Sequence, residues 1–124
     1  MVPLSTCERS EFVMAAICRP IRQRRQRGVQ QALALVPNGA RCIITIDCDG
    51  LDPGVIQAVI VPQPRGLSYG EVIELLDGIA ARARIIGFNL VELVPSLDVR
   101  GLGALTVTRL VCKAIGCIAG QQLR

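Results

Sequence analysis

Two apolar runs that each end in acidic side chains constrain the fold of this chain more than any other feature. Residues 41–46 (RCIITI) and 84–93 (RIIGFNLVEL) are nearly continuous stretches of Ile, Leu, Val and Phe. Such continuous runs are typical of strands in a parallel sheet that is covered on both faces. Both runs are therefore predicted to be strands.

Helical patterns follow both predicted strands. The first begins with a capping box, Ser68-x-x-Glu71, and continues with apolar residues at helical spacing, namely Val72, Leu75, Leu76 and Ile79. The second runs from about Leu102 to Ala119. The order strand–helix–strand–helix predicts an α/β fold, a three-layer αβα arrangement with a mainly parallel sheet.

Composition predicts a cytoplasmic protein of one domain. The chain has 124 residues, of which 51% are hydrophobic, a net charge of +4, six cysteines and no histidine. The cysteines include no C-x-x-C pair, so reduced thiols are expected rather than disulfides or a zinc site. We find no signal peptide pattern and no run of about 20 apolar residues, so no membrane partner is expected.

The first 27 residues form a poorly defined amino-terminal segment, whereas residues 28–124 carry the domain pattern. Five arginines lie at positions 19, 22, 24, 25 and 27. Because no aromatic residues lie between them to stack on bases, we interpret them as a solvated helix face rather than a nucleic-acid site.

Three carboxylates, Asp47, Asp49 and Glu92, are expected at the carboxyl ends of the two strands, where parallel sheets bind ligands. Asp47 and Asp49 would point to the same side of an extended chain. Oxygen ligands suit Mg²⁺, Mn²⁺ or Ca²⁺. Alternatively, the two aspartates cap or order the following turn, a role that we assign to Asp52 because it precedes a proline.

Two known metal motifs were compared with residues 47–53. An EF-hand loop requires different residues at positions 51 and 52, so that interpretation fails. A haloacid-dehalogenase-type phosphatase also begins with a strand and D-x-D-G. It remains an alternative, although no later paired acidic motif follows.

Three segments in order, "ITIDCDGLDP" (44–53), "PQPRGLSYGEVIELL" (62–76) and "IIGFNLVELVPSLD" (85–98), resemble the carboxyl-terminal half of the ureohydrolases, the arginase and agmatinase family. The agmatinase branch is the more similar one. The resemblance extends from about Gly28 to Gly120.

The resemblance implies a metal-dependent amidinohydrolase. Family members use two manganese ions and a bridging hydroxide to hydrolyse a guanidino C–N bond of agmatine or a similar small molecule, with release of urea. Asp47 and Asp49 match two metal ligands of the family. Glu92 matches the glutamate that holds the substrate guanidinium, which a carboxylate can bind bidentately.

The chain also departs from the family pattern. It contains two of the six usual ligands, and its lack of histidine excludes two others. Positions usually occupied by other residues hold Ala58, Ile60, Arg65, Asn89 and Gly103. We therefore expect a truncated ureohydrolase that is inactive alone, or alternatively a non-catalytic subunit that pairs with a complete paralogue. An incomplete sheet also predicts self-association or a homo-oligomer.

Overall fold

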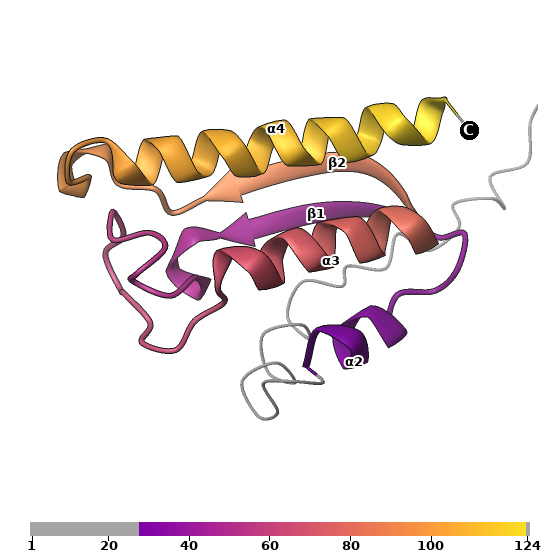
Figure 1. The fold of residues 1–124 in the computed structure, drawn as a ribbon, viewed down its shortest axis with the longest axis horizontal. Helices are drawn as coiled ribbons and strands as arrows, with labels where there is room; N and C mark the ends of the chain where they lie inside the picture. The colour runs from indigo at the N-terminus through magenta and orange to yellow at the C-terminus, as the bar shows by residue number, and fades with distance from the viewer. Residues whose placement is uncertain (1–27, 124) are drawn as a thin grey trace, which may run out of the picture.

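A computed structural model describes residues 28–123 of the chain (Figure 1). The amino-terminal segment 1–27, with its arginines and two of the six cysteines, lies outside the described residues. In chain order the elements are α2 (Gly28–Ala34), β1 (Arg41–Asp47), the 3₁₀ turn η1 (Cys48–Gly50), α3 (Tyr69–Arg82), β2 (Arg84–Val91), the 3₁₀ turn η2 (Pro95–Leu97) and α4 (Leu102–Gln122).

The two predicted strands pair in parallel, as expected. Arg41 lies opposite Arg84 and Asp47 opposite Val91, with one irregularity between Cys42 and Ile43. The two strands therefore begin and end together, and their carboxyl ends lie at the same edge of the sheet.

The helix α3 begins where the capping box predicts. The Ser68 side chain accepts a hydrogen bond from the Glu71 N–H, and the Glu71 carboxylate accepts one from the Ser68 N–H. All four apolar residues predicted at helical spacing are buried. The helix α4 packs inward through Leu110 and Ala114.

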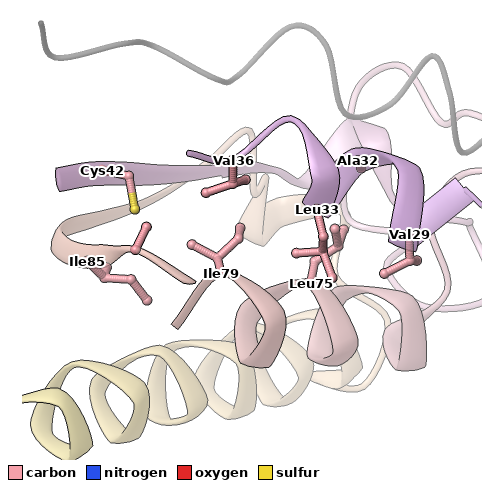
Figure 2. Close-up of a cluster of buried hydrophobic side chains, with 9 residues drawn as sticks. Val29, Ala32, Leu33, Val36, Cys42, Leu75, Ile79 and Ile85 are labelled. Atoms are coloured by element: carbon pink, nitrogen blue, oxygen red, sulfur yellow. The ribbon is translucent and has the colours of Figure 1, made fainter. Parts of the chain in front are cut away.

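The core consists of two clusters of aliphatic side chains between the sheet and the helices. The first joins α2, α3 and the start of both strands, and Figure 2 shows it around Leu33, Cys42, Ile79 and Ile85. The second lies nearer the carboxyl ends of the strands and contains Leu76 of α3 and Leu110 of α4. Because α3 and α4 contact each other and both contact β2, they cover the same face of the sheet.

The opposite face of the sheet has no helix on it among residues 28–123. Successive connections of the same hand place consecutive helices on one side, so a second helical layer needs a reversal of strand order. We call this uncovered surface the open face. By strand alternation, interrupted in β2 by the irregularity at Ile86–Gly87, its residues are Arg41, Ile43, Thr45 and Asp47 of β1 and Arg84, Ile86, Asn89 and Val91 of β2.

The helix α4 is more apolar than expected from the sequence. It is long and apolar enough to cross a membrane by length and composition, with a mean hydropathy of 1.6, and only 17% of that stretch is buried. The sequence prediction that no run reaches this length is therefore wrong by this measure. One such helix is weak support for a membrane span, and its inner face packs on the sheet and α3.

Candidate active site

Asp47 ends β1 and begins the turn that follows it. Its Oδ1 accepts a hydrogen bond of 2.9 Å from the Asp49 N–H, which makes it the N-cap of η1. The prediction that Asp47 and Asp49 lie on one extended segment is wrong, because the chain turns immediately after Asp47. Asp47 therefore orders the turn, which is the alternative role considered for it. This role uses only Oδ1 and leaves Oδ2 for other partners.

Asp49 is only partly buried, but it contains the one buried side-chain oxygen or nitrogen atom in residues 28–123 that has no hydrogen-bond partner. Its Oδ1 is buried and has no hydrogen-bond partner. A buried carboxylate oxygen without a partner costs free energy, so a native site normally supplies a donor or a cation. The structure therefore marks Asp49 as a position where a cation would be stabilising.

The buried thiol of Cys48 lies between these two aspartates in the chain. Its pKa is raised from 9.0 to about 11, mainly by burial and in smaller part by the charges of Asp47, Asp49 and Glu92. The thiol therefore stays protonated at neutral pH. The charge of each of the three carboxylates acts on this thiol in the direction that disfavours its ionisation.

Glu92 directly follows β2 and adopts an unusual backbone conformation. Its φ is +63°, in the left-handed region that non-glycine residues rarely occupy. Two residues later the chain is fixed again, because the Val94 N–H donates to the Ala58 carbonyl at 2.8 Å. Strained residues of this kind cluster at functional sites, which motivates a role for Glu92.

Asp52 organises the loop after η1, as predicted for a turn residue. Its Oδ1 accepts from the Gly54 N–H at 2.9 Å, and its Oδ2 accepts from the Arg65 N–H at 3.0 Å. The Asp52 N–H in turn donates to the Leu67 carbonyl. One carboxylate thus ties both ends of the 54–66 loop to the segment that carries Asp49.

Several positions that depart from the family pattern have a visible structural consequence. Arg65 holds a φ of +64°, a conformation that favours glycine. The Asn89 amide faces Thr45 Oγ1 at 3.5 Å. The Gly103 N–H donates to Asp98 Oδ1 at 2.8 Å, so Asp98 caps the start of α4.

The described residues do not make a complete metal site. No group of three or more His, Cys, Asp or Glu side chains in residues 28–123 is placed to hold one ion. The donor chemistry of Asp47 and Asp49 fits a hard divalent cation, but their number is too small.

Sequence reasoning missed three features of this region. These are the orphaned oxygen of Asp49, the left-handed conformation of Glu92 and the hydrogen bond that the Arg65 N–H donates to the Asp52 carboxylate. The third had a signal, because Asp before Pro commonly starts a turn. The other two depend on tertiary packing and leave no trace in the sequence pattern.

A family model described as "Arginase family" matches residues 9–117 of the chain. Among curated proteins, the chain is 37% identical over 78 residues to N(1)-aminopropylagmatine ureohydrolase of Thermus thermophilus, which covers 63% of this chain and 26% of that protein. It is 31% identical over 90 residues to the protein of the same name from Synechocystis, covering 71% of this chain and 28% of the relative.

Solved structures give the same assignment. The agmatine ureohydrolase of Thermoplasma volcanium superposes with a TM-score of 0.67 and 27% identity, over 77% of this chain and 32% of that structure. The relatives have the αβα arrangement predicted from the sequence, of which the described residues supply two parallel strands and one helical layer. The chain spans about a quarter of the length of the curated relatives it matches.

Proposed function

This chain belongs to the arginase family, and from that premise we propose that it carries part of a ureohydrolase active site. Asp47 and Asp49 are the proposed metal ligands, and Glu92 is the proposed partner of a substrate guanidinium. The substrate class is a small guanidino compound, such as agmatine or a derivative of it. The names of the similar ureohydrolases support this choice.

The observation that carries the proposal is the orphaned Oδ1 of Asp49. It lies at the carboxyl end of a parallel strand, where ligands bind in such folds. A cation there would supply the partner that the oxygen lacks. Arginase-family members are generally manganese-dependent, and a bound manganese pair would lower the pKa of a coordinated water and stabilise developing charge.

The side chains of this chain contribute orientation. The hydrogen bond from the Asp49 N–H fixes the Asp47 carboxylate through Oδ1. The fork that Asp52 makes with Gly54 and Arg65 holds the adjoining loop in place. Glu92, exposed at the end of β2, can accept two parallel N–H bonds from a planar guanidinium group.

We propose that the isolated chain does not hydrolyse guanidino compounds. Two carboxylates are too few ligands for a pair of metal ions, which need about four or more donors each. The alternative proposal is a non-catalytic subunit beside a complete paralogue. The absence of a three-ligand group in the described part of the chain is compatible with both.

Manganese binding provides the test, because it needs no activity. Titration of purified protein with Mn²⁺, followed by the electron paramagnetic resonance signal of the free ion, should detect a weak site. Asp49→Asn should weaken it about tenfold or more, since outer-shell groups alone are worth that much. Asp77→Asn is the matched control, because Asp77 lies on α3 and pairs with Lys113.

Two results would contradict these proposals separately. Equal Mn²⁺ affinity in the wild type and in Asp49→Asn would remove the metal role of Asp49. Release of urea from agmatine by the wild-type chain with manganese, lost in Asp47→Asn, would show that the isolated chain is active.

A further inference from the structure

Asp49 is held between two buried residues. Cys48 is fully buried and Leu51 is 2% exposed, and both side chains belong to the second aliphatic cluster. The Asp49 N–H is also fixed, because it donates to Asp47 Oδ1. The backbone is therefore held on both sides of Asp49, which limits how far its carboxylate can turn toward solvent. This restraint explains how the buried Oδ1 remains without a partner, although such an atom costs free energy.

A segment distant in the sequence holds the same turn from its far end. The Leu67 N–H donates to the Gly50 carbonyl at 2.9 Å, and the Asp52 N–H donates to the Leu67 carbonyl at 2.9 Å. These two bonds form a parallel bridge between Leu51 and Leu67. We call residues 50–52 and 65–67, paired in this way, the clasp. Its position ties the restraint on Asp49 to contacts made some fifteen residues further along the chain.

The Asp52 carboxylate closes the clasp. It accepts the Gly54 N–H through Oδ1 and the Arg65 N–H through Oδ2, so one side chain is bonded to both ends of the intervening loop. Hydrogen bonds to an ionised acceptor are stronger than those between neutral groups. Gly66 permits the close approach, because a Cβ there would lie 2.6 Å from the Asp52 nitrogen. The clasp therefore depends on one carboxylate and on one residue without a side chain.

We propose that the clasp positions Asp49 for a cation, with Asp52 and Gly66 as positioning residues. The proposal rests on the proposed metal role of Asp49. The clasp supplies no hydrogen-bond donor to Asp49 Oδ1, so it acts through the backbone. Without it, the Asp49 carboxylate can turn toward water, and the cost of its unpaired oxygen disappears. A cation then has to restore the binding-competent orientation, and its apparent affinity falls by the fraction of molecules that lack this orientation.

Asp98 provides a control for a role that is merely structural. Its carboxylate also accepts two backbone N–H groups, those of Gly103 at 2.8 Å and Ala104 at 2.9 Å. Like Asp52, it is partly buried. Its bonds hold the start of α4 rather than the turn that carries Asp49. Loss of either carboxylate should therefore destabilise the fold in the same way, whereas only the loss of Asp52 should change the cation site.

Titration of the full chain with Mn²⁺, followed by the electron paramagnetic resonance signal of the free ion, compares Asp52→Asn with Asp98→Asn. Each substitution removes one charge and replaces one acceptor oxygen by an NH₂ group. Asp52→Asn should raise the Mn²⁺ dissociation constant about tenfold, as is typical when a group that orients a metal ligand is lost. Asp98→Asn should leave it unchanged. Circular dichroism of each sample confirms that the titrated protein is folded.

Gly66→Ala tests the clasp without any change of charge. The added Cβ forces residue 66 away from the backbone of Leu51 and Asp52. It should weaken Mn²⁺ binding in the same direction as Asp52→Asn. Gly70→Ala is the matched control, because a Cβ at Gly70 meets nothing within 4 Å. This pair decides the question if Asp52→Asn does not fold.

The outcomes separate this proposal from the one on which it rests. Weaker Mn²⁺ binding in Asp49→Asn, with wild-type binding in both Asp52→Asn and Gly66→Ala, would overturn the positioning role and keep the metal role of Asp49. Equal weakening in Asp52→Asn and Asp98→Asn would assign the effect to net charge or general stability, and would also overturn it. Unchanged binding in Asp49→Asn would remove the metal role itself.

Discussion

Replacing Glu92 by glycine should leave the fold more stable than replacing it by alanine. Both substitutions remove the carboxylate, so the comparison isolates the backbone. At a φ of +63°, any residue with a Cβ is strained, by about 1–2 kcal/mol. Glycine removes that strain but gains flexibility in the unfolded chain, which costs about 0.4–1 kcal/mol.

The midpoints of these two ranges differ by about 0.8 kcal/mol, which is the expected advantage in unfolding free energy of Glu92→Gly over Glu92→Ala. For a domain of this size it corresponds to a rise in melting temperature of roughly 2–8 °C. Thermal and urea unfolding followed by circular dichroism would measure it.

The matched control is the same pair of substitutions at Arg109, an exposed residue inside α4. There glycine should be less stable than alanine by about 1 kcal/mol. Equal or lower stability of Glu92→Gly relative to Glu92→Ala would refute the argument that Glu92 holds a strained conformation.

Two further predictions concern buried parts of the same region. Because the pKa of Cys48 is raised from 9.0 to about 11, the folded state holds this proton more tightly than the unfolded state. In metal-free protein, the bound proton should therefore stabilise the fold fully below pH 9. This contribution to the unfolding free energy, at most about 3 kcal/mol, should be lost between pH 9 and 11. Urea unfolding across that range should show a smaller loss of unfolding free energy in Cys48→Ala than in the wild type. The same dependence of unfolding free energy on pH in both proteins would contradict a raised pKa at Cys48. Gly66→Ala should lower the unfolding free energy by about 1–3 kcal/mol. The added Cβ would lie 2.6 Å from backbone atoms of Leu51 and Asp52. Gly70→Ala, which meets nothing within 4 Å, should not destabilise in the same urea assay, and similar losses in both would contradict the packing argument.

The sequence predicted the elements of this fold well because their signals are local. The capping box at Ser68 and the spacing of Val72 to Ile79 depend on neighbouring residues along one helix, and both are confirmed. The strands were predicted from their continuous apolar character, and their bounds differ by at most two residues. What local signals did not give was the side of the sheet on which each helix packs.

The candidate site was predicted less completely, because its geometry depends on contacts between distant residues. The turn after Asp47 is closed by the Asp49 N–H on Asp47 Oδ1 and by the Leu51 N–H on the Cys48 carbonyl, and its far end is held by hydrogen bonds from Leu67 to Gly50 and from Asp52 to Leu67. These contacts remove the extended conformation that the alternation argument assumed for Asp47 and Asp49. The position of each carboxylate at a strand end could be predicted from the local sequence pattern. The orientation of the carboxylates relative to each other could not, because it depends on how the folded chain turns.

Two left-handed residues near the site, Glu92 and Arg65, lead to different conclusions. Both occupy conformations that disfavour side chains, with φ of +63° and +64°. At Glu92 the strain accompanies a carboxylate in a proposed functional role, and such strain is commonly retained where it orients a reacting group. At Arg65 the strain accompanies no proposed functional role, although the conformation is one that favours glycine. Because the Asp52 carboxylate still accepts the Arg65 N–H, this hydrogen bond offsets part of the strain. The same carboxylate therefore holds both ends of the 54–66 loop, with Arg65 in its strained conformation.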